Sequence, residues 1–205
     1  MKKQSKAARD LVVFLKGKRG ITLRPPSLDD VPALTRWIND PELRRFIKRP
    51  FPMTLHGESE WVQSLAKRSD TDVVFAIDLD GVHIGMMGLH KINWKDRTAT
   101  TGAFIGDKRY WGQGYGTDAK MALLDYAFNT LDLRKLSSQV YAFNTRSIAY
   151  SLHCGYVEEG RLIRQRFIEG QYHDEVILGL FKEQWLPRWE LYKAGKSLSS
   201  KRKQS

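Results

Sequence analysis

The distribution of apolar and polar positions predicts strands alternating with helices. Apolar-rich segments at 72–79 and 82–94 flank Asp80-Gly81, a dipeptide that supplies the positive φ angles of a tight hairpin turn. A third strand, 98–106, follows after a short turn. The remaining strand-like segments are, in chain order, 11–15, 21–24, 134–142, 156–159, 162–168 and 172–181.

Helical spacing of apolar residues predicts amphipathic helices over 27–39 and from the glycine-rich segment to about Thr130. Shorter helices are expected from Asp40-Pro41, over 57–68 and over 145–154. Runs of strands that enclose two late helices are typical of a mixed, mainly antiparallel α/β layer structure.

Charge is concentrated at the ends of the 205-residue chain. Residues 1–20 carry a net +6 and residues 193–205 a net +5, which together equal the whole excess of +11. We therefore predict a basic extension over 1–10, one domain over 11–192, and a basic tail without fixed structure over 193–205. Contact with nucleic acid, the ribosome or an anionic membrane is expected only through these ends.

The single cysteine, Cys154, excludes disulfides within the chain and any cysteine-based zinc cluster. We expect no metal, and a thiol that contributes packing rather than chemistry. The apolar run Leu11–Leu15 is too short for a secretory signal, and no stretch approaches a membrane span. These features predict a cytoplasmic protein.

A glycine-rich segment carries the strongest functional signal. Gly112, Gly114 and Gly116 follow a predicted strand and lead directly into a helix. Such positions let backbone N–H groups approach a bulky anion at the positive end of the helix. The third glycine comes one position too early for a dinucleotide fingerprint, and the segment lacks the Gly-Lys-Ser/Thr of a nucleoside triphosphatase. By spacing alone, a tight connection without a ligand remains an equal alternative.

Two motifs resemble one known family. Gly112-Gln113-Gly114-Tyr115-Gly116 is similar to the acyl-CoA pyrophosphate loop of GCN5-related N-acetyltransferases (GNAT). Asn144-Thr145-Arg146-Ser147, followed by Gly155-Tyr156-Val157-Glu158-Glu159-Gly160, resembles the family's second signature. The resemblance covers roughly 14–182 and is closest to the branch of ribosomal-protein N-terminal and spermidine acetyltransferases. Trp111 departs from the Gln or Arg of the loop, but we expect little effect because this position acts mostly through its backbone.

The resemblance implies a central sheet of about seven strands flanked by helices, and acetyl-CoA as cosubstrate. It implies acetyl transfer to a primary amine, on a small molecule or a protein N-terminus, by direct attack in a ternary complex. Backbone groups of Phe104 and Ile105 would polarise the thioester carbonyl. Homodimers are plausible in such a family. The implied cosubstrate-binding residues are Phe104, Ile105, Trp111, Gly112, Gln113, Gly114, Tyr115, Gly116, Thr117, Asn144 and Ser147.

The acid that protonates the departing thiolate stays open between three residues. Ser147 matches the serine proposed for this role in the ribosomal-protein branch, but the glutamate base nineteen residues later is Arg166 here. The tyrosine acid of other branches is replaced by Ser151. Tyr150, one position earlier, would lie about 100° away around the helix and is more typical of the core. We therefore favour Ser147 over Tyr150 and Ser151.

The general base is also open, with candidates on the acceptor side: His90, Glu58, Glu60, His173 and Asp174. The missing glutamate and tyrosine leave an alternative function, a noncatalytic CoA-binding or RNA- or ribosome-associated module. A basic cluster near the second helix favours either a solvated helix face or an acidic acceptor; it comprises Arg44, Arg45, Lys48 and Arg49.

Overall fold

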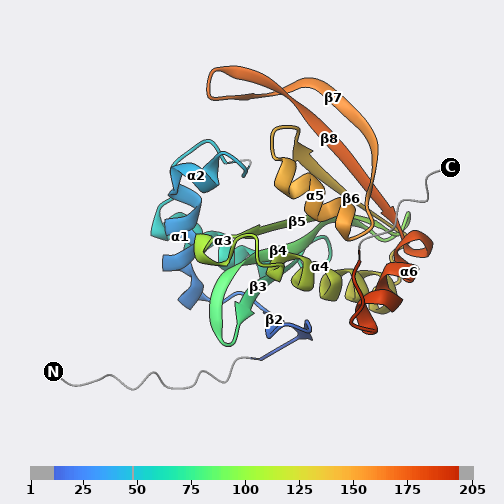
Figure 1. The fold of residues 1–205 in the computed structure, drawn as a ribbon. Helices are drawn as coiled ribbons and strands as arrows, with labels where there is room; N and C mark the ends of the chain where they lie inside the picture. The colour runs from blue at the N-terminus through green and yellow to red at the C-terminus, as the bar shows by residue number, and fades with distance from the viewer. Residues whose placement is uncertain (1–11, 48, 199–205) are drawn as a thin grey trace.

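One eight-stranded sheet runs through the molecule in the order β1-β2-β3-β4-β5-β6-β8-β7 (Figure 1). Neighbouring strands are antiparallel except β5 and β6, which are parallel. The predicted mixed, mainly antiparallel fold is confirmed, with eight strands where about seven were expected. The strands are β1 (Leu15–Lys16), β2 (Ile21–Arg24), β3 (Val73–Leu79), β4 (Val82–Asn93), β5 (Thr98–Ile105), β6 (Lys135–Tyr141), β7 (Val157–Ile168) and β8 (Gln171–Phe181).

This computed structural model describes residues 12–47 and 49–198. The predicted basic segment 1–10, residues 199–205 of the predicted tail and Lys48 of the basic cluster lie outside the described residues. The helices are α1 (Val31–Asn39), α2 (Pro41–Arg44), α3 (Leu55–Ser64), α4 (Tyr115–Asp125), α5 (Thr145–His153) and α6 (Lys182–Lys193). A π-helical turn, Tyr126–Thr130, continues α4.

The helices cover both faces of the sheet because side chains alternate along its central strands. In β3, Phe75 and Ile77 join the core cluster that includes α4 and α6, whereas Ala76 joins the cluster under α1 and α3. In β4, Met87 and Met86 divide between the clusters in the same way. Figure 1 shows α1, α2 and α3 grouped at one end, and the long β7–β8 hairpin extending away from the body.

A buried ion cluster fixes the start of α1 against the sheet. Arg24 on β2 donates to both carboxylate oxygens of Asp30 at 2.8 Å, and its Nε donates to Asp78 of β3 at 2.8 Å. All three side chains are at most 3% exposed. The geometry supplies the pairing that buried charges require.

Three local differences from the sequence prediction have physical causes. Of the expected strand 11–15, only Leu15 belongs to β1 within the described residues, although the Phe14 N–H also donates to the Leu23 carbonyl of β2 at 2.9 Å. The segments 156–159 and 162–168 form one strand, β7, because two irregularities in its pairing with β8 accommodate the extra residues. The sequence analysis assigned no element to the residues of α6; Pro187 lies inside this helix, and packing of the fully buried Trp185 holds it on the core.

Candidate active site

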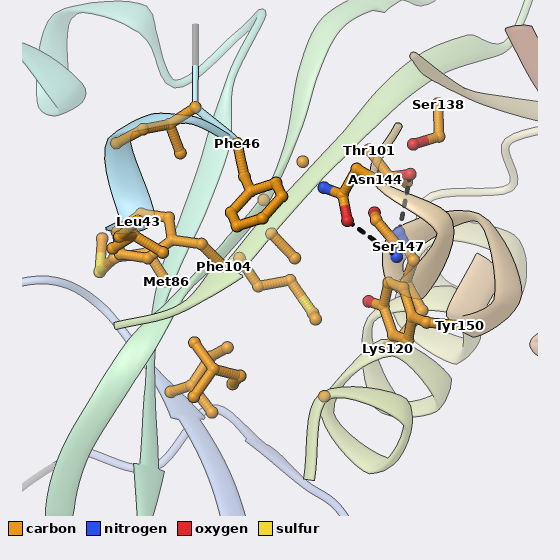
Figure 2. A pocket seen from close by; sticks show the side chains of 18 of the residues that line it. Leu43, Phe46, Met86, Thr101, Phe104, Lys120, Ser138, Asn144, Ser147 and Tyr150 are labelled. Carbon is orange, nitrogen blue, oxygen red and sulfur yellow. Dashed lines mark hydrogen bonds between the residues drawn. The ribbon is translucent and has the colours of Figure 1, made fainter. Parts of the chain in front are cut away.

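A cleft of about 720 Å³ opens between the α1–α3 end of the molecule and the glycine-rich segment. Its walls combine the two halves of the candidate site. Apolar side chains from α1, from β4 and from α2 with the residues just after it form one wall, and polar side chains from α4, from β5 and from α5 with its N-cap form the other. Figure 2 shows the first group in Leu43, Phe46 and Met86, and the second in Thr101, Lys120, Asn144, Ser147 and Tyr150.

The sheet divides beside this cleft. β5 and β6 pair only from Thr98↔Lys135 to Thr100↔Ser137. Beyond that point β5 continues along β4 as far as Ile105, and β6 continues along β8 as far as Tyr141. Within the described residues, the last part of β5 therefore has a strand neighbour on one side only. We call the gap between β5 and β6 the notch.

The direction of the β5 backbone groups follows from the alternation of hydrogen bonds along a strand. The Gly106 N–H donates to the Ile84 carbonyl of β4 at 2.8 Å. The backbone groups of Phe104 therefore face β4, and those of Ala103 and Ile105 face the notch. The Trp111 indole N–H agrees with this assignment, because it donates to the Ile105 carbonyl at 2.7 Å. Of the two predicted polarising residues, only Ile105 directs its backbone to the notch.

The glycine-rich segment forms the predicted turn at the start of α4. Gly112 has a φ of 74° and Gly114, the N-cap, has a φ of 84°, both in the left-handed region that favours glycine. The first hydrogen bond of the turn runs from the Asp118 N–H to the Gly114 carbonyl. The N–H groups of residues 115–117 precede it at the positive end of the helix dipole, an arrangement suited to a phosphate.

Asp118 anchors the first hairpin to this turn, which sequence analysis did not predict. Its buried carboxylate accepts from the Lys18 N–H at 3.0 Å, the Arg19 N–H at 2.9 Å and the Tyr192 hydroxyl at 2.5 Å. Gly17 permits this approach, since a Cβ there would lie 2.2 Å from the carboxylate. The result is a cation beside the loop, with the Arg19 guanidinium 5.7 Å from the Tyr115 ring.

The Trp111 side chain makes two contacts, although this position was expected to act mostly through its backbone. Besides its bond to Ile105, the ring lies 4.0 Å from the Arg146 guanidinium. Arg146 comes from the second signature motif, at the start of α5. Trp111 therefore ties the loop to both β5 and α5.

The second motif begins α5 and contributes to the cleft. The Asn144 side chain caps the helix by accepting from the Ser147 N–H at 3.1 Å, and both residues line the cleft. Tyr150 packs against the core, as its position predicts, and it also lines the cleft; its buried hydroxyl has no hydrogen-bond partner among the described residues. Burial raises the pKa of Tyr150 well above its ordinary value. Ser151 is buried and is not among the described residues that line the cleft.

Lys120 on α4 is a cleft residue that sequence analysis missed. It is 1% exposed, and its Nζ donates to the Thr101 hydroxyl at 2.8 Å. The Tyr150 and Tyr156 rings lie 5.4 and 5.1 Å from Nζ. Burial lowers the pKa of Lys120 to about 8. A lysine within Ala-Lys-Met-Ala-Leu-Leu, a run that is otherwise small or apolar, was the available signal.

The base candidates are placed very differently. Glu58 on α3 is fully buried, lines the cleft, and has no hydrogen-bond partner for either carboxylate oxygen among the described residues. Burial raises the pKa of Glu58, opposed by the positive charge of Arg49. His90 lines the cleft with its Nδ1 2.7 Å from Asp72. Glu60 is exposed on the same helix as Glu58.

The remaining candidates and the basic cluster have structural partners. Asp174 accepts from the Arg164 N–H, and the His173 ring packs against Phe143 at 4.8 Å. The described part of the chain brings neither of them to the cleft. In the basic cluster, Arg45 pairs with Glu169 at 2.9 Å and Arg49 lies over the Trp61 ring at 5.8 Å. Arg166, which stands where a glutamate was sought, binds Glu175 at 2.8 Å.

The described residues contain neither a membrane-crossing helix nor a cluster of metal ligands. Among these residues, no helix is both long and apolar enough to cross a membrane. Within the same residues, no group of three or more His, Cys, Asp or Glu side chains could hold a metal ion.

Comparisons with known proteins agree with this geometry. The sequence profile of the acetyltransferase (GNAT) domain matches residues 21–157. Spermidine N(1)-acetyltransferase of Escherichia coli K12 is 27% identical over 167 residues, which span 81% of this chain and 88% of that protein.

Two solved structures, both under 25% identical, share the fold. The Vibrio cholerae spermidine N-acetyltransferase in complex with CoA and spermine superposes with a TM-score of 0.76 at 24% identity, covering 82% of this chain and 99% of the other. Mycobacterium smegmatis RimJ in complex with CoA-disulfide gives 0.76 at 24% identity, covering 89% and 93%.

Proposed function

We infer that the chain, which belongs to the acetyltransferase (GNAT) domain family, is an acetyl-CoA-dependent N-acetyltransferase. We propose that the notch and the α4 turn bind acetyl-CoA while the α1–α3 side of the cleft receives a primary amine. The observation that carries this proposal is the meeting of three features in one cleft: a turn suited to phosphate, an open strand edge and a buried carboxylate without a partner.

The cosubstrate fits the residues present. N–H groups over 112–117 would hold its diphosphate, and Arg19 adds a positive charge beside them. The open edge of β5 would hold the pantetheine arm as an added strand would be held. The N–H groups of Ala103 and Ile105 face the notch, where they could stabilise charge that develops on the thioester oxygen.

Glu58 is our candidate base for the amine. A lysine-like amine has a pKa of about 10.4, so it must lose a proton before attack at neutral pH. A buried carboxylate without a partner attracts an ammonium group, and its raised pKa suits it to accept the proton. The free amine then attacks the carbonyl directly, and no covalent enzyme intermediate forms.

The acceptor that fits best carries one amine next to an apolar group. Glu58 is the one carboxylate among the described residues that line the cleft. A polyamine with several positive charges would favour more acidic walls. The acceptor side is lined instead by apolar side chains, which include Leu34, Ile38, Leu43, Phe46, Trp61 and Met86.

This function is tested by measuring acetyl transfer to a panel of amines, with the release of CoA thiol as the readout. The panel pairs aromatic and aliphatic monoamines with spermidine and N-terminal peptides. We expect Glu58→Gln to lower kcat/KM for the best amine about 10²-fold while leaving the Kd for CoA unchanged. The matched control is Glu60→Gln, which removes an exposed carboxylate from the same helix and should behave as wild type.

Two results would contradict the proposal. Equal activity of Glu58→Gln and wild type would remove Glu58 as the base, and a selective loss in His90→Asn would transfer that role to His90. CoA binding without turnover of any amine would favour the noncatalytic alternative.

We also propose where the protein is located and which parts of it contact partners. A single buried cysteine fits a reducing cytoplasm. The basic ends are the sites we propose for any ribosome or RNA contact, and homodimerisation remains a prediction.

A further inference from the structure

The Lys120 ammonium group lies at the closed end of the notch. Its hydrogen-bond acceptor, Thr101, is the first β5 residue after the last pair with β6, and Ser138 holds the equivalent place on β6. Lys120, Thr101 and Ser138 all line the cleft (Figure 2). The α4 helix thus brings a cation to the point where the two strands separate.

Among the described residues, this cation lacks the partners that a buried lysine normally has. An ammonium group has three donors, and within this part of the chain one of them is used, in the bond to Thr101. The titratable groups that face it are Tyr150, Cys154 and Tyr156, and burial raises the pKa of each, so all stay neutral near pH 7. Removing a charge from water without a counter-charge is costly. Unused donors at the wall of a cleft, next to the unpartnered Tyr150 hydroxyl, indicate a bound ligand group that accepts them.

We propose that Lys120 is the catalytic acid of the acetyl transfer, which gives a proton from Nζ to the CoA sulfur as the C–S bond breaks. The inference rests on the function proposed above. As the amine nitrogen forms its bond to the acetyl carbon, the C–S electron pair passes to sulfur and the Nζ proton follows it. Glu58 takes the proton that the ammonium group loses before attack and releases it to water, so it can then take the second proton, which the nitrogen loses as the amide forms. Neutral Lys120 regains a proton from water after the products leave.

Lys120 suits this role better than the hydroxyl groups nearby. A free thiol has a pKa of about 8.5, so an acid of similar pKa can both give and regain the proton near neutrality. The lowered pKa of Lys120 meets this condition. Burial makes the Tyr150 hydroxyl a much weaker acid, so we assign it the positioning of the sulfur. Lys120 thus supplies the acid that the family's tyrosine position, Ser151 in this chain, does not.

The first test uses Lys120→Met, which keeps the length of the side chain and removes its charge. Because replacing a buried ion with an apolar side chain is often neutral or stabilising, the variant should fold. We expect kcat to fall about 10²-fold or more. The Kd for CoA should stay within about threefold. The wild-type rate should fall at alkaline pH as Lys120 loses its proton, and this fall should be absent in Lys120→Met. Lys67→Met removes an exposed lysine and controls for net charge.

The second test reads the proton directly and needs no turnover. Ultraviolet difference absorbance follows ionisation of the bound CoA thiol in the complex of protein and CoA. A nearby ammonium group lowers the pKa of that thiol, so we expect a lower value in wild type than in Lys120→Met. Thr101→Val removes the oxygen that accepts the hydrogen bond from Lys120. This loss disfavours the charged form of Lys120 and lowers its pKa, so the fall in rate at alkaline pH should begin at a lower pH.

The outcomes are distinct. The proposal is overturned if the bound thiol titrates alike in wild type and Lys120→Met, or if Lys120→Met keeps kcat and the alkaline limb. It is also overturned if wild type prefers succinyl-CoA to acetyl-CoA and Lys120→Met loses that preference. Lys120 would then bind the carboxylate of the acyl group. A wild type that acetylates no amine refutes the proposed function, while the thiol titration still decides the position of Lys120.

Discussion

Gly112 offers a sharp test of the α4 turn because Gly81 provides a matched control. The two glycines have φ angles of 74° and 78°, and a Cβ added to either would meet nothing within 4 Å. Alanine in the left-handed region costs about 1–2 kcal/mol. At this chain length each kcal/mol lowers Tm by about 2–4 °C, so Gly112→Ala and Gly81→Ala should each lose about 2–8 °C.

Binding should separate the two variants. Gly112 lines the cleft, whereas Gly81 lies in the β3–β4 turn outside it. A methyl group at Gly112 would push the diphosphate away from a backbone N–H. A hydrogen bond to a charged group contributes about 1.5–3 kcal/mol, which corresponds to about a 10- to 150-fold rise in the Kd for CoA.

Calorimetric titration with CoA, alongside thermal melting, measures both effects. Gly81→Ala should bind CoA as wild type does, despite an equal loss of Tm. If Gly112→Ala also binds CoA with wild-type affinity, the α4 turn does not hold the cosubstrate, and the assignment of the loop fails.

Three further predictions concern other parts of the structure. Arg19→Gln keeps the backbone bond to Asp118 but removes a charge, so the Kd for CoA should rise about three- to tenfold and depend less on salt, which titrations at two ionic strengths would measure; an unchanged salt dependence would argue against contact with phosphate. Asp30→Asn leaves Arg24 without its full counter-charge and should lower the free energy of unfolding by about 3–5 kcal/mol at pH 7. Burial alone would raise the pKa of Asp30, but the hydrogen bonds from Arg24 and Ser27 outweigh it and lower that pKa. The wild-type advantage is therefore complete above the unfolded pKa of about 3.9 and shrinks as pH falls through the lower folded value; an equal gap in urea unfolding at pH 7 and pH 3 would contradict this. Because burial raises the pKa of Cys154 to about 12, its thiol should react with a disulfide reagent only as fast as the protein opens, and rapid labelling of the native protein would refute its burial.

Much of the fold could be predicted because local patterns determine it. The Asp80-Gly81 hairpin forms in the structure, and the glycine-rich segment leads into α4 as expected. The α6 helix could not be predicted in this way. Pro187 argues against a helix locally, and the packing of Trp185, Trp189, Leu191 and Tyr192 against the core outweighs it.

The candidate site divides along the same line. Residues whose role depends on backbone shape, such as Gly112 and Gly114, are visible in a motif. Lys120 is not, because it lies about 100° around the helix from the apolar stripe of Ala119 and Leu123, where a lysine is normally solvated. The structure buries nearly every side of α4 beneath other elements, so that position becomes interior. Glu58 was one of several candidates, and only the fold distinguishes it from the exposed Glu60.

The three residue pairs between β5 and β6 join a five-stranded block to a three-stranded block. Beyond that seam β5 and β6 no longer pair as strands, and the buried core that includes α4 continues from one block to the other. A molecule that fills the notch would bridge the two blocks, because it would contact one block through β5 and the other through α5. Occupancy of the cleft would then add a connection between the two blocks on the side where the strands separate.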